Sequence, residues 1–231
     1  MSTLTFIQSQ SLRDQALSAI RAGIVVGEIE PGRIYSVPTI AARLGVSATP
    51  VREAMLELEA EGLLESIRNK GFRVIPLTDR DLDEIFELRL LLEVPTVGQV
   101  AGNLSAEAAR ALEEEIAIME SATKSDDLTA FLAADRRFHL GLLAQAGNER
   151  LVKTVDRLRE HARLNGLTGL MRAGQLLETT LEHRRIAEAV VAGDREKAED
   201  LMRTHLRHTR GVWAGVREDS AAQKIQAQQS T

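Results

Sequence analysis

Helical spacing of apolar residues runs through most of this chain and constrains its fold more than any other feature. Apolar residues recur three and four positions apart along most of the sequence, which is the pattern of amphipathic helices. The alternation typical of strands occurs in only two short stretches, Leu63 to Ile67 and Gly71 to Ile75. Aromatic residues make up only 3% of the chain, which further disfavours β-sandwiches and barrels. We therefore predict a mainly α protein.

Length and composition limit the other classes of protein. The 231 residues suffice for one large domain or two modest ones, and 44% hydrophobic with 27% charged residues is typical of a globular chain. Cysteine is absent, which excludes disulfides, thiolate metal sites and cysteine nucleophiles. The sequence contains neither a signal peptide pattern nor the roughly 20 apolar residues of a membrane span. We expect a soluble, cytoplasmic protein with no membrane partner.

The first 75 residues indicate a fixed order of elements. A first helix is predicted from Ser11 to Val26, and a second, within Thr39 to Ser47, can be capped by Thr39 and stopped by Gly45. Ser47 is a candidate cap for a third helix. The two alternating stretches flank a basic hairpin tip at Arg68 to Gly71. This is the order of a winged helix-turn-helix, whose third helix can enter the major groove of DNA. A module that docks another protein is the alternative.

Charge is divided unevenly along the chain. The formal net charge is −5, which taken alone speaks against a nucleic-acid partner. Up to Ile75, however, 8 Lys and Arg balance 8 Asp and Glu, while the remainder carries 21 against 26. The acidic excess therefore belongs to the second part, and a neutral first part would read DNA through a few placed residues.

The segment from Ile40 to Leu64, IAARLGVSATPVREAMLELEAEGLL, together with Asn69 to Val74, resembles the DNA-binding domain of the GntR family of bacterial transcriptional regulators. The resemblance implies that operator DNA is contacted by Ser47, Thr49, Arg52, Arg68, Asn69, Lys70 and Gly71. Two positions depart from the family pattern, since Ala48 replaces a common Arg and Pro38 replaces a residue that is often basic or polar. We expect weaker operator affinity or an unusual sequence preference as a result.

A second domain is predicted after Pro76 to Asp79, which breaks the second strand and can cap a new helix. We place a winged-helix domain at 1–76, a linker at 77–79, an all-α domain at 80–216 and a flexible tail at 217–231. Helices are predicted at 81–102, 105–121, 126–146, 148–165, 171–192 and 194–213. Short loops favour an antiparallel bundle of six to seven helices.

One carboxylate and three imidazoles fall on helix faces that are predicted to point inward. Asp135 and His139 are four residues apart on one helix, while His183 and His205 lie on apolar stripes of two others. Taken singly, each is more often a locally hydrogen-bonded or core residue. Burying all four without a shared partner would be costly, so together they suggest a divalent ion. Zinc suits this ligand set, with nickel or manganese as alternatives, and positions remain open for water or an anion.

The resemblance extends to this second domain. The Asp135-Arg-Arg-Phe-His139 pattern, the helix containing Glu182-His183-Arg and the final helix with His205 are similar to the FadR-type (FCD) ligand domain of GntR regulators. In its metal-binding branch, an Asp and three His at the matching positions hold the ion. Of the other histidines, His208 is expected in the core. The last, His161, is expected at the surface in a basic run with Arg157, Arg159 and Arg163.

Arg89 is our candidate for binding a carboxylate effector, because a guanidinium group matches that geometry. Alternatively, Arg89 pairs with Glu93 on the helix surface or lies at a subunit contact. Together these patterns predict a transcriptional regulator, not an enzyme. We expect a homodimer, and the resemblance implies that a small organic acid at the metal controls its operator binding. Repression relieved by ligand is the commoner behaviour of the family, and operator binding strengthened by ligand is the alternative. A metal-dependent hydrolase using the Asp/His site, or a purely structural metal, is the alternative.

Overall fold

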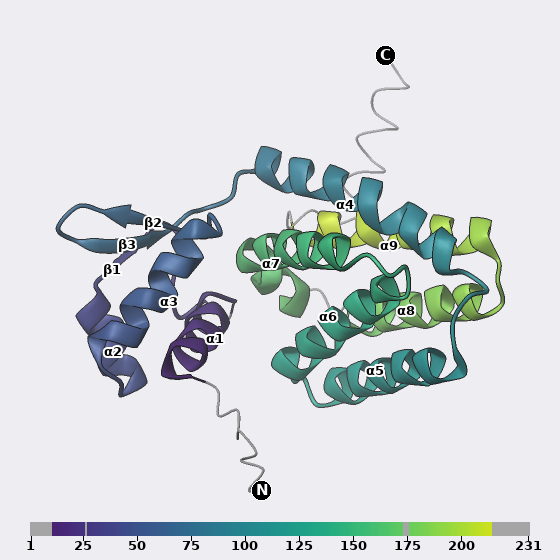
Figure 1. Ribbon diagram of the computed structural model, residues 1–231, viewed down its shortest axis with the longest axis horizontal. Coiled ribbons are helices and arrows are strands. Elements are labelled where there is room, and N and C mark those ends of the chain that lie inside the picture. The colour runs from purple at the N-terminus through teal and green to yellow at the C-terminus, as the bar shows by residue number, and fades with distance from the viewer. Residues whose placement is uncertain (1–10, 26, 173–175, 214–231) are drawn as a thin grey trace, which may run out of the picture. The chain divides into compact units, whose positions relative to one another are not determined.

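The computed structural model describes residues 11–25, 27–172 and 176–213 (Figure 1). The chain forms two compact units, Met1–Pro76 and Leu77–Thr231, each with its own core. The fold is mainly α, as predicted, with a winged helix-turn-helix followed by a helical bundle. The tail predicted at 217–231 lies outside the described residues.

The N-terminal unit contains the predicted three helices and hairpin plus one further strand. Its elements are α1 (Leu12–Val25), β1 (Ile34–Tyr35), α2 (Val37–Leu44), α3 (Ala48–Ala60), β2 (Leu64–Ile67) and β3 (Gly71–Val74). The strands form an antiparallel sheet in the order β1-β3-β2, in which Phe72 lies opposite Tyr35 on one side and Ser66 on the other. Strand β1 was missed because two residues are too few to show alternation.

The start of α2 differs from the sequence prediction, which used Thr39 as the cap. Ser36 is the N-cap, and its hydroxyl accepts a hydrogen bond from the Thr39 backbone amide at 3.2 Å. Pro38 then falls in the first turn, where its missing N–H costs nothing. The helix ends as predicted at Gly45, whose φ of 67° lies in the left-handed region.

The second unit contains six helices within the described residues, which corresponds to the predicted set. They are α4 (Asp79–Val100), α5 (Ala106–Lys124), α6 (Leu128–Ala144), α7 (Glu149–Arg172), α8 (Leu176–Val191) and α9 (Arg195–Trp213). Helix α7 extends beyond its predicted end because Gly166 and Gly169 weaken a helix without breaking it. Thr78 caps α4, and it exchanges hydrogen bonds with Asp81 in a capping box.

The helices of the bundle pack in pairs around the chemistry-bearing residues. Helix α4 packs along α9, α8 packs on α9, and α5 lies beside both α6 and α8 (Figure 1). Fully buried apolar side chains fill the space between them, including Ile116, Phe138, Ile186 and Val190. No helix in the described part of the chain has the length and apolar character needed to cross a membrane.

Candidate functional site

Three helices converge on one buried cluster in the second unit. Asp135 and His139 lie one turn apart on α6, His183 lies on α8 and His205 lies on α9. All four side chains are buried, and one ligand atom from each lies within 4.8 Å of the others. The structure therefore brings together the four residues that were selected from the sequence.

The spacing within this cluster matches that of ligands around a metal. The Nε2 atom of His183 lies 3.0 Å from Nε2 of His139 and 3.1 Å from Oδ1 of Asp135. The third separation, from His139 Nε2 to Asp135 Oδ1, is 3.8 Å. Ligand atoms at about 2.1 Å from an ion, and about 90 to 109° apart, are separated by about 3.0 to 3.4 Å. Two of the three separations therefore suit a common ion without large movement.

Two of the three imidazoles place Nδ1 at hydrogen-bond distance from an oxygen acceptor. Nδ1 of His183 lies 2.6 Å from the backbone oxygen of Thr179, and Nδ1 of His205 lies 2.9 Å from Oε2 of Glu182. Nδ1 of His139 lies 3.3 Å from Oε2 of Glu93, an ion-pair contact outside hydrogen-bond geometry. Because these oxygens only accept, His183 and His205 donate from Nδ1, and in the neutral form of each ring the Nε2 lone pair is directed into the cluster.

With a neutral His183, its Nε2 atom and Oδ1 of Asp135 are two acceptors that face each other in the cluster. Nε2 of His183 points at both Asp135 and Nε2 of His139, and the buried Nε2 of His205 has no hydrogen-bond partner among the described residues. Buried lone pairs that face one another are unfavourable unless a cation lies between them. The donor set and its orientation therefore fit a divalent metal ion.

A buried ion network borders the cluster on one side. Glu93 accepts hydrogen bonds from Nε of Arg89 at 2.5 Å and from Nη1 of Arg159 at 3.3 Å. Arg159 also donates from Nη2 to Oδ2 of Asp135 at 2.6 Å. Arg89 thus pairs with Glu93, as the alternative interpretation of the sequence predicted. Arg89 is only 2% exposed, however, so this pair is buried and does not lie on the helix surface. Two guanidinium groups balance two carboxylates here, so a divalent ion would add positive charge that attracts an anion.

Burial and neighbouring charges keep these groups in the forms that bind a metal. Burial, together with the positive charge of Arg159, lowers the pKa of His139 well below its usual value. Burial and the adjacent His183 lower the pKa of His205 to about 4. Burial alone would raise the pKa of Glu93, but Arg89 and Arg159 hold it well below its usual value. His139 and His205 are therefore neutral at pH 7, and Glu93 is ionised.

Sequence reasoning missed Arg159, which it placed at the surface within a basic run. Arg159 is 3% exposed, and His161 from the same run is partly buried. The missed signal is the spacing of Val155, Arg159 and Ala162, four and then three residues apart on the buried face of α7. Glu182 was also missed as a partner of His205. The core placement expected for His208 is found.

The first turns of α3 expose the residues expected to contact DNA. Ser47 is the N-cap of α3, but its side chain makes no capping hydrogen bond. Ser47, Thr49 and Arg52 are all exposed. The hairpin tip likewise exposes Arg68, Asn69 and Lys70. These groups are thus accessible to a partner.

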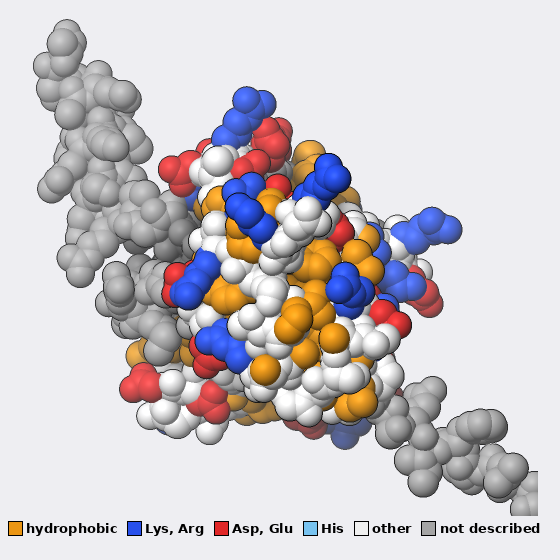
Figure 2. All heavy atoms as spheres, turned by 90° about the vertical axis from the view of Figure 1, so that its left-hand side faces the viewer, with side chains coloured by type: hydrophobic (Ala, Val, Ile, Leu, Met, Phe, Trp, Pro, Cys, Tyr) orange, Lys and Arg blue, Asp and Glu red, His pale blue; other side chains and the backbone are white. Residues whose placement is uncertain are grey.

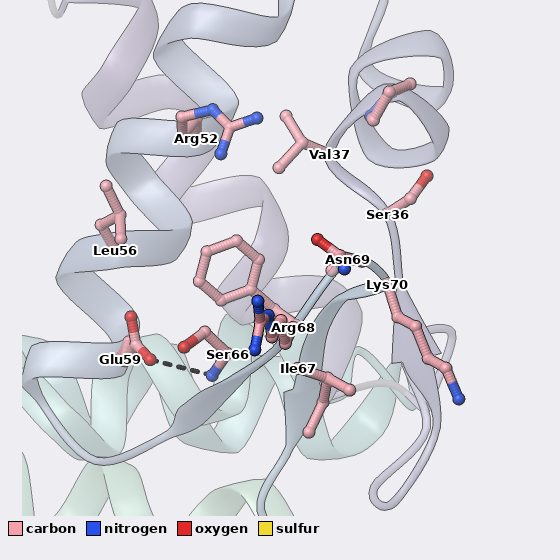
Figure 3. Close-up of a pocket in the computed structure, with 13 residues that line it drawn as sticks. Ser36, Val37, Arg52, Leu56, Glu59, Ser66, Ile67, Arg68, Asn69 and Lys70 are labelled. Carbon is pink, nitrogen blue, oxygen red and sulfur yellow. Dashed lines mark hydrogen bonds between the residues drawn. The ribbon is translucent and has the colours of Figure 1, made fainter.

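A hollow of about 750 Å³ separates α3 from the hairpin and the start of α2 (Figure 3). Arg52 extends across it toward Val37, whereas Lys70 points away from Arg52 (Figure 3). Glu59 closes one end by accepting a hydrogen bond from the Ser66 amide at 2.8 Å. Five of the expected DNA contacts line this hollow, namely Arg52, Arg68, Asn69, Lys70 and Gly71. Ser47 and Thr49 do not line it. Figure 2, viewed from the left-hand side of Figure 1, shows Lys and Arg side chains scattered among apolar and some acidic ones.

Gly71 has a structural reason to be glycine. Its φ is +131°, and a Cβ atom there would lie 2.2 Å from the backbone oxygen of Tyr35. Only glycine allows β1 to approach β3 this closely. The position of the hairpin tip therefore depends on Gly71.

Comparisons with known proteins agree with both halves of this architecture. Residues 12–74 match the bacterial regulatory proteins of the gntR family, and residues 84–208 match the FCD domain. The chain is 31% identical to the HTH-type transcriptional regulator YdhC of Bacillus subtilis, over 84% of this chain and 87% of that protein. It is 35% identical, over the same shares, to a protein described as a probable D-xylose utilization operon transcriptional repressor of Paenarthrobacter nicotinovorans. The solved structure of Escherichia coli McbR/YncC has the same fold, with a TM-score of 0.79 at 24% identity over 89% of this chain and 98% of that one. The chain therefore belongs to the GntR family of bacterial transcriptional regulators and carries an FCD domain after its DNA-binding domain.

Proposed function

We propose that this regulator is a homodimeric repressor that releases its operator when a small organic acid binds at a metal ion in the FCD domain. GntR regulators bind operator DNA, FCD domains bind small effectors and commonly bind a metal, and members of the family are not enzymes. Nothing supports the hydrolase alternative. The observation that carries the proposal is the convergence of Asp135, His139, His183 and His205, since one ligand atom from each lies within 4.8 Å of the others.

Zinc is the metal that we propose, held by Asp135, His139, His183 and His205. Three imidazoles and one carboxylate form a borderline ligand set that suits zinc, with nickel and manganese as alternatives. When bound, the ion supplies a Lewis-acidic centre with positions left for an external oxygen ligand. The chain's own contribution is to hold the imidazole tautomers and to exclude water from their Nδ1 contacts.

A carboxylate is the proposed effector class. The buried arginines and carboxylates beside the cluster balance in charge, so an added divalent ion leaves a positive excess that an organic anion neutralises. Arg89 is proposed to stabilise that anion, because it lies next to Glu93, which also contacts His139 and Arg159. A planar guanidinium group is well matched to a carboxylate.

Helix α4 offers the route by which the effector could control DNA binding. It carries Arg89 and Glu93, and it begins at Asp79, only five residues after the end of the wing strand β3 at Val74. An effector that shifts α4 would therefore act on a short connection to the DNA-binding unit. This is a population shift, in which the effector binds one conformation of the dimer more tightly.

DNA contacts are proposed for Ser47, Thr49 and Arg52 at the start of α3, and for the wing tip Arg68, Asn69, Lys70 and Gly71. The exposure of the α3 residues and of Arg68, Asn69 and Lys70 supports this role. One recognition helix provides few base contacts, so paired half-sites read by a homodimer would supply the remaining affinity.

A thermal-shift screen of small carboxylates tests the sensor proposal. We expect a suitable acid to raise the melting temperature of the zinc-loaded chain but not of the chelator-treated chain. Asp135→Asn should lose the response, whereas Glu188→Gln, at an exposed position of α8, should keep it. Equal stabilisation with and without metal would contradict the proposal. A purely structural metal would instead leave effector-driven DNA release intact in Asp135→Asn, measured on an operator selected from random DNA.

A further inference from the structure

Glu182 lies between two histidines of a neighbouring helix. Its Oε2 atom is 2.9 Å from Nδ1 of His205, and its Oε1 atom is 2.8 Å from Nδ1 of His208. His205 and His208 are one turn apart on α9, while Glu182 precedes His183 on α8. Both imidazoles are buried, and the Glu182 side chain is 15% exposed. One carboxylate thus contacts a candidate metal ligand and a second, non-ligand histidine.

The contact with Glu182 determines which ring nitrogen of His205 and His208 carries the proton. A carboxylate only accepts hydrogen bonds, so a neutral His205 must carry its proton on Nδ1, and its Nε2 lone pair is then directed into the cluster. His208 takes the other carboxylate oxygen, which prevents Glu182 from rotating away from His205. Glu182 is therefore the shared hydrogen-bond acceptor of both imidazoles.

We propose that Glu182 is a positioning residue of the metal centre, which holds His205 in its ligating tautomer and orientation, and that His208 acts through Glu182. This inference rests on the metal site of the proposed function. The three ligand histidines are held differently, since His183 is held by the backbone oxygen of Thr179. No side-chain change can remove that contact, whereas the contact to His205 depends entirely on Glu182. Carboxylates that accept from a ligating imidazole also raise its basicity and so strengthen metal binding.

Substitutions of Glu182 have graded consequences. Glu182→Ala removes the acceptor from both histidines. In Glu182→Gln, the amide oxygen can still accept from His205, but the amide NH₂ then faces Nδ1 of His208. His208 must therefore move its proton from Nδ1 to Nε2, while His205 keeps its tautomer. His208→Phe leaves Glu182 in place but frees it to rotate.

Zinc affinity of the full chain, measured by competition with a chromophoric chelator, tests the inference. Glu182→Ala should bind zinc about 10- to 100-fold more weakly than wild type, which is the usual effect of losing such a partner. Glu182→Gln and His208→Phe should show smaller losses. Glu188→Ala, which removes an exposed carboxylate from the same helix, should bind as wild type. If Glu182→Ala does not fold, Glu182→Gln and His208→Phe decide the matter.

Nitrogen-15 spectra of the histidine side chains give a second readout, which a merely structural role would not move. In Glu182→Gln, we expect His208 alone to change tautomer. Wild-type zinc affinity in Glu182→Ala, or unchanged imidazole signals in Glu182→Gln, would overturn the inference while leaving the metal site intact. Failure of the wild-type chain to bind zinc would overturn the metal site as well, so the two failures are distinguishable.

Discussion

Arg159 on α7 donates from Nη2 to Oδ2 of Asp135 on α6 at 2.6 Å, while Oδ1 of the same carboxylate lies 3.1 Å from Nε2 of His183. The guanidinium thus determines which carboxylate oxygen faces the imidazoles. It also contacts Glu93 at 3.3 Å, and all three charged groups are buried. Arg159 therefore compensates two buried negative charges and orients one candidate metal ligand.

Arg159→Leu should destabilise the metal-free chain strongly. The change leaves Asp135 and Glu93 with less compensation, and removing one partner of a buried ion pair typically costs about 3 to 5 kcal/mol. Urea denaturation followed by circular dichroism measures the loss. Arg136→Leu is the matched control, because Arg136 pairs with Asp156 across the same two helices but is exposed. Arg136→Leu should lower the free energy of unfolding by less than about 1 kcal/mol. Equal losses of stability in the two variants would contradict the assigned role of Arg159.

Zinc should raise the melting temperature of the wild-type chain, and His183→Ala should abolish the effect. Binding to the folded state alone adds about 2.7 kcal/mol of stability when free ligand exceeds its dissociation constant about 100-fold. His183 lies at the centre of the cluster, so its loss removes the contacts to both Asp135 and His139. Asp156→Asn, which changes a carboxylate outside the cluster, should respond as wild type. A full zinc response in His183→Ala would show that the metal binds elsewhere.

The sequence predicted the candidate metal ligands because each lies on a periodic helix face. Asp135 and His139 share a face through their spacing of four, and the apolar stripe around His183 places it inward without knowledge of the fold. The hairpin was found for a similar reason, since its two strands alternate. Local periodicity was therefore sufficient for both features.

Contacts between helices could not be predicted in the same way. The bond from Arg159 to Asp135 depends on how α7 packs on α6, and the bridge from Glu182 to His205 depends on how α8 packs on α9. No periodic spacing in the sequence indicates either contact.

The wrong cap predicted for α2 has a local cause. Ser36 and Thr39 are both suitable N-cap residues, and only the backbone conformation decides between them.

Arg52→Ala and Lys70→Ala should weaken DNA binding in different ways. Arg52 projects from α3, so its loss should cost about 1 to 3 kcal/mol on a selected operator and relax the sequence preference. Lys70 at the exposed wing tip is expected to contact phosphate, so its loss should weaken binding to all DNA sequences alike. It should also reduce the slope of log affinity against log salt concentration by about one. Fluorescence anisotropy at several salt concentrations separates the two effects. Arg195→Ala, which removes an exposed charge from the second unit, is the control, and an equal effect there would contradict the proposed interface.

Acidification should destabilise the metal-free chain in two successive ranges of pH. Burial and the neighbouring His183 lower the pKa of His205 from 6.5 to about 4, so the unfolded chain binds the proton more readily than the folded one between these values. The contribution of His205 to the unfolding free energy is therefore fully present above pH 6.5 and is lost as the pH falls toward 4. Hydrogen bonds from His205 and His208 overcome the opposing effect of burial and lower the pKa of Glu182 from 4.5 to about 2, so its contribution is lost only below about pH 4.5.

Denaturation curves in the presence of chelator, measured for wild type and His205→Gln, check the order of these losses. The difference between the two chains should shrink between pH 6.5 and 4, because the variant lacks this titration. A constant difference over that range would show that His205 is not held neutral in the folded chain.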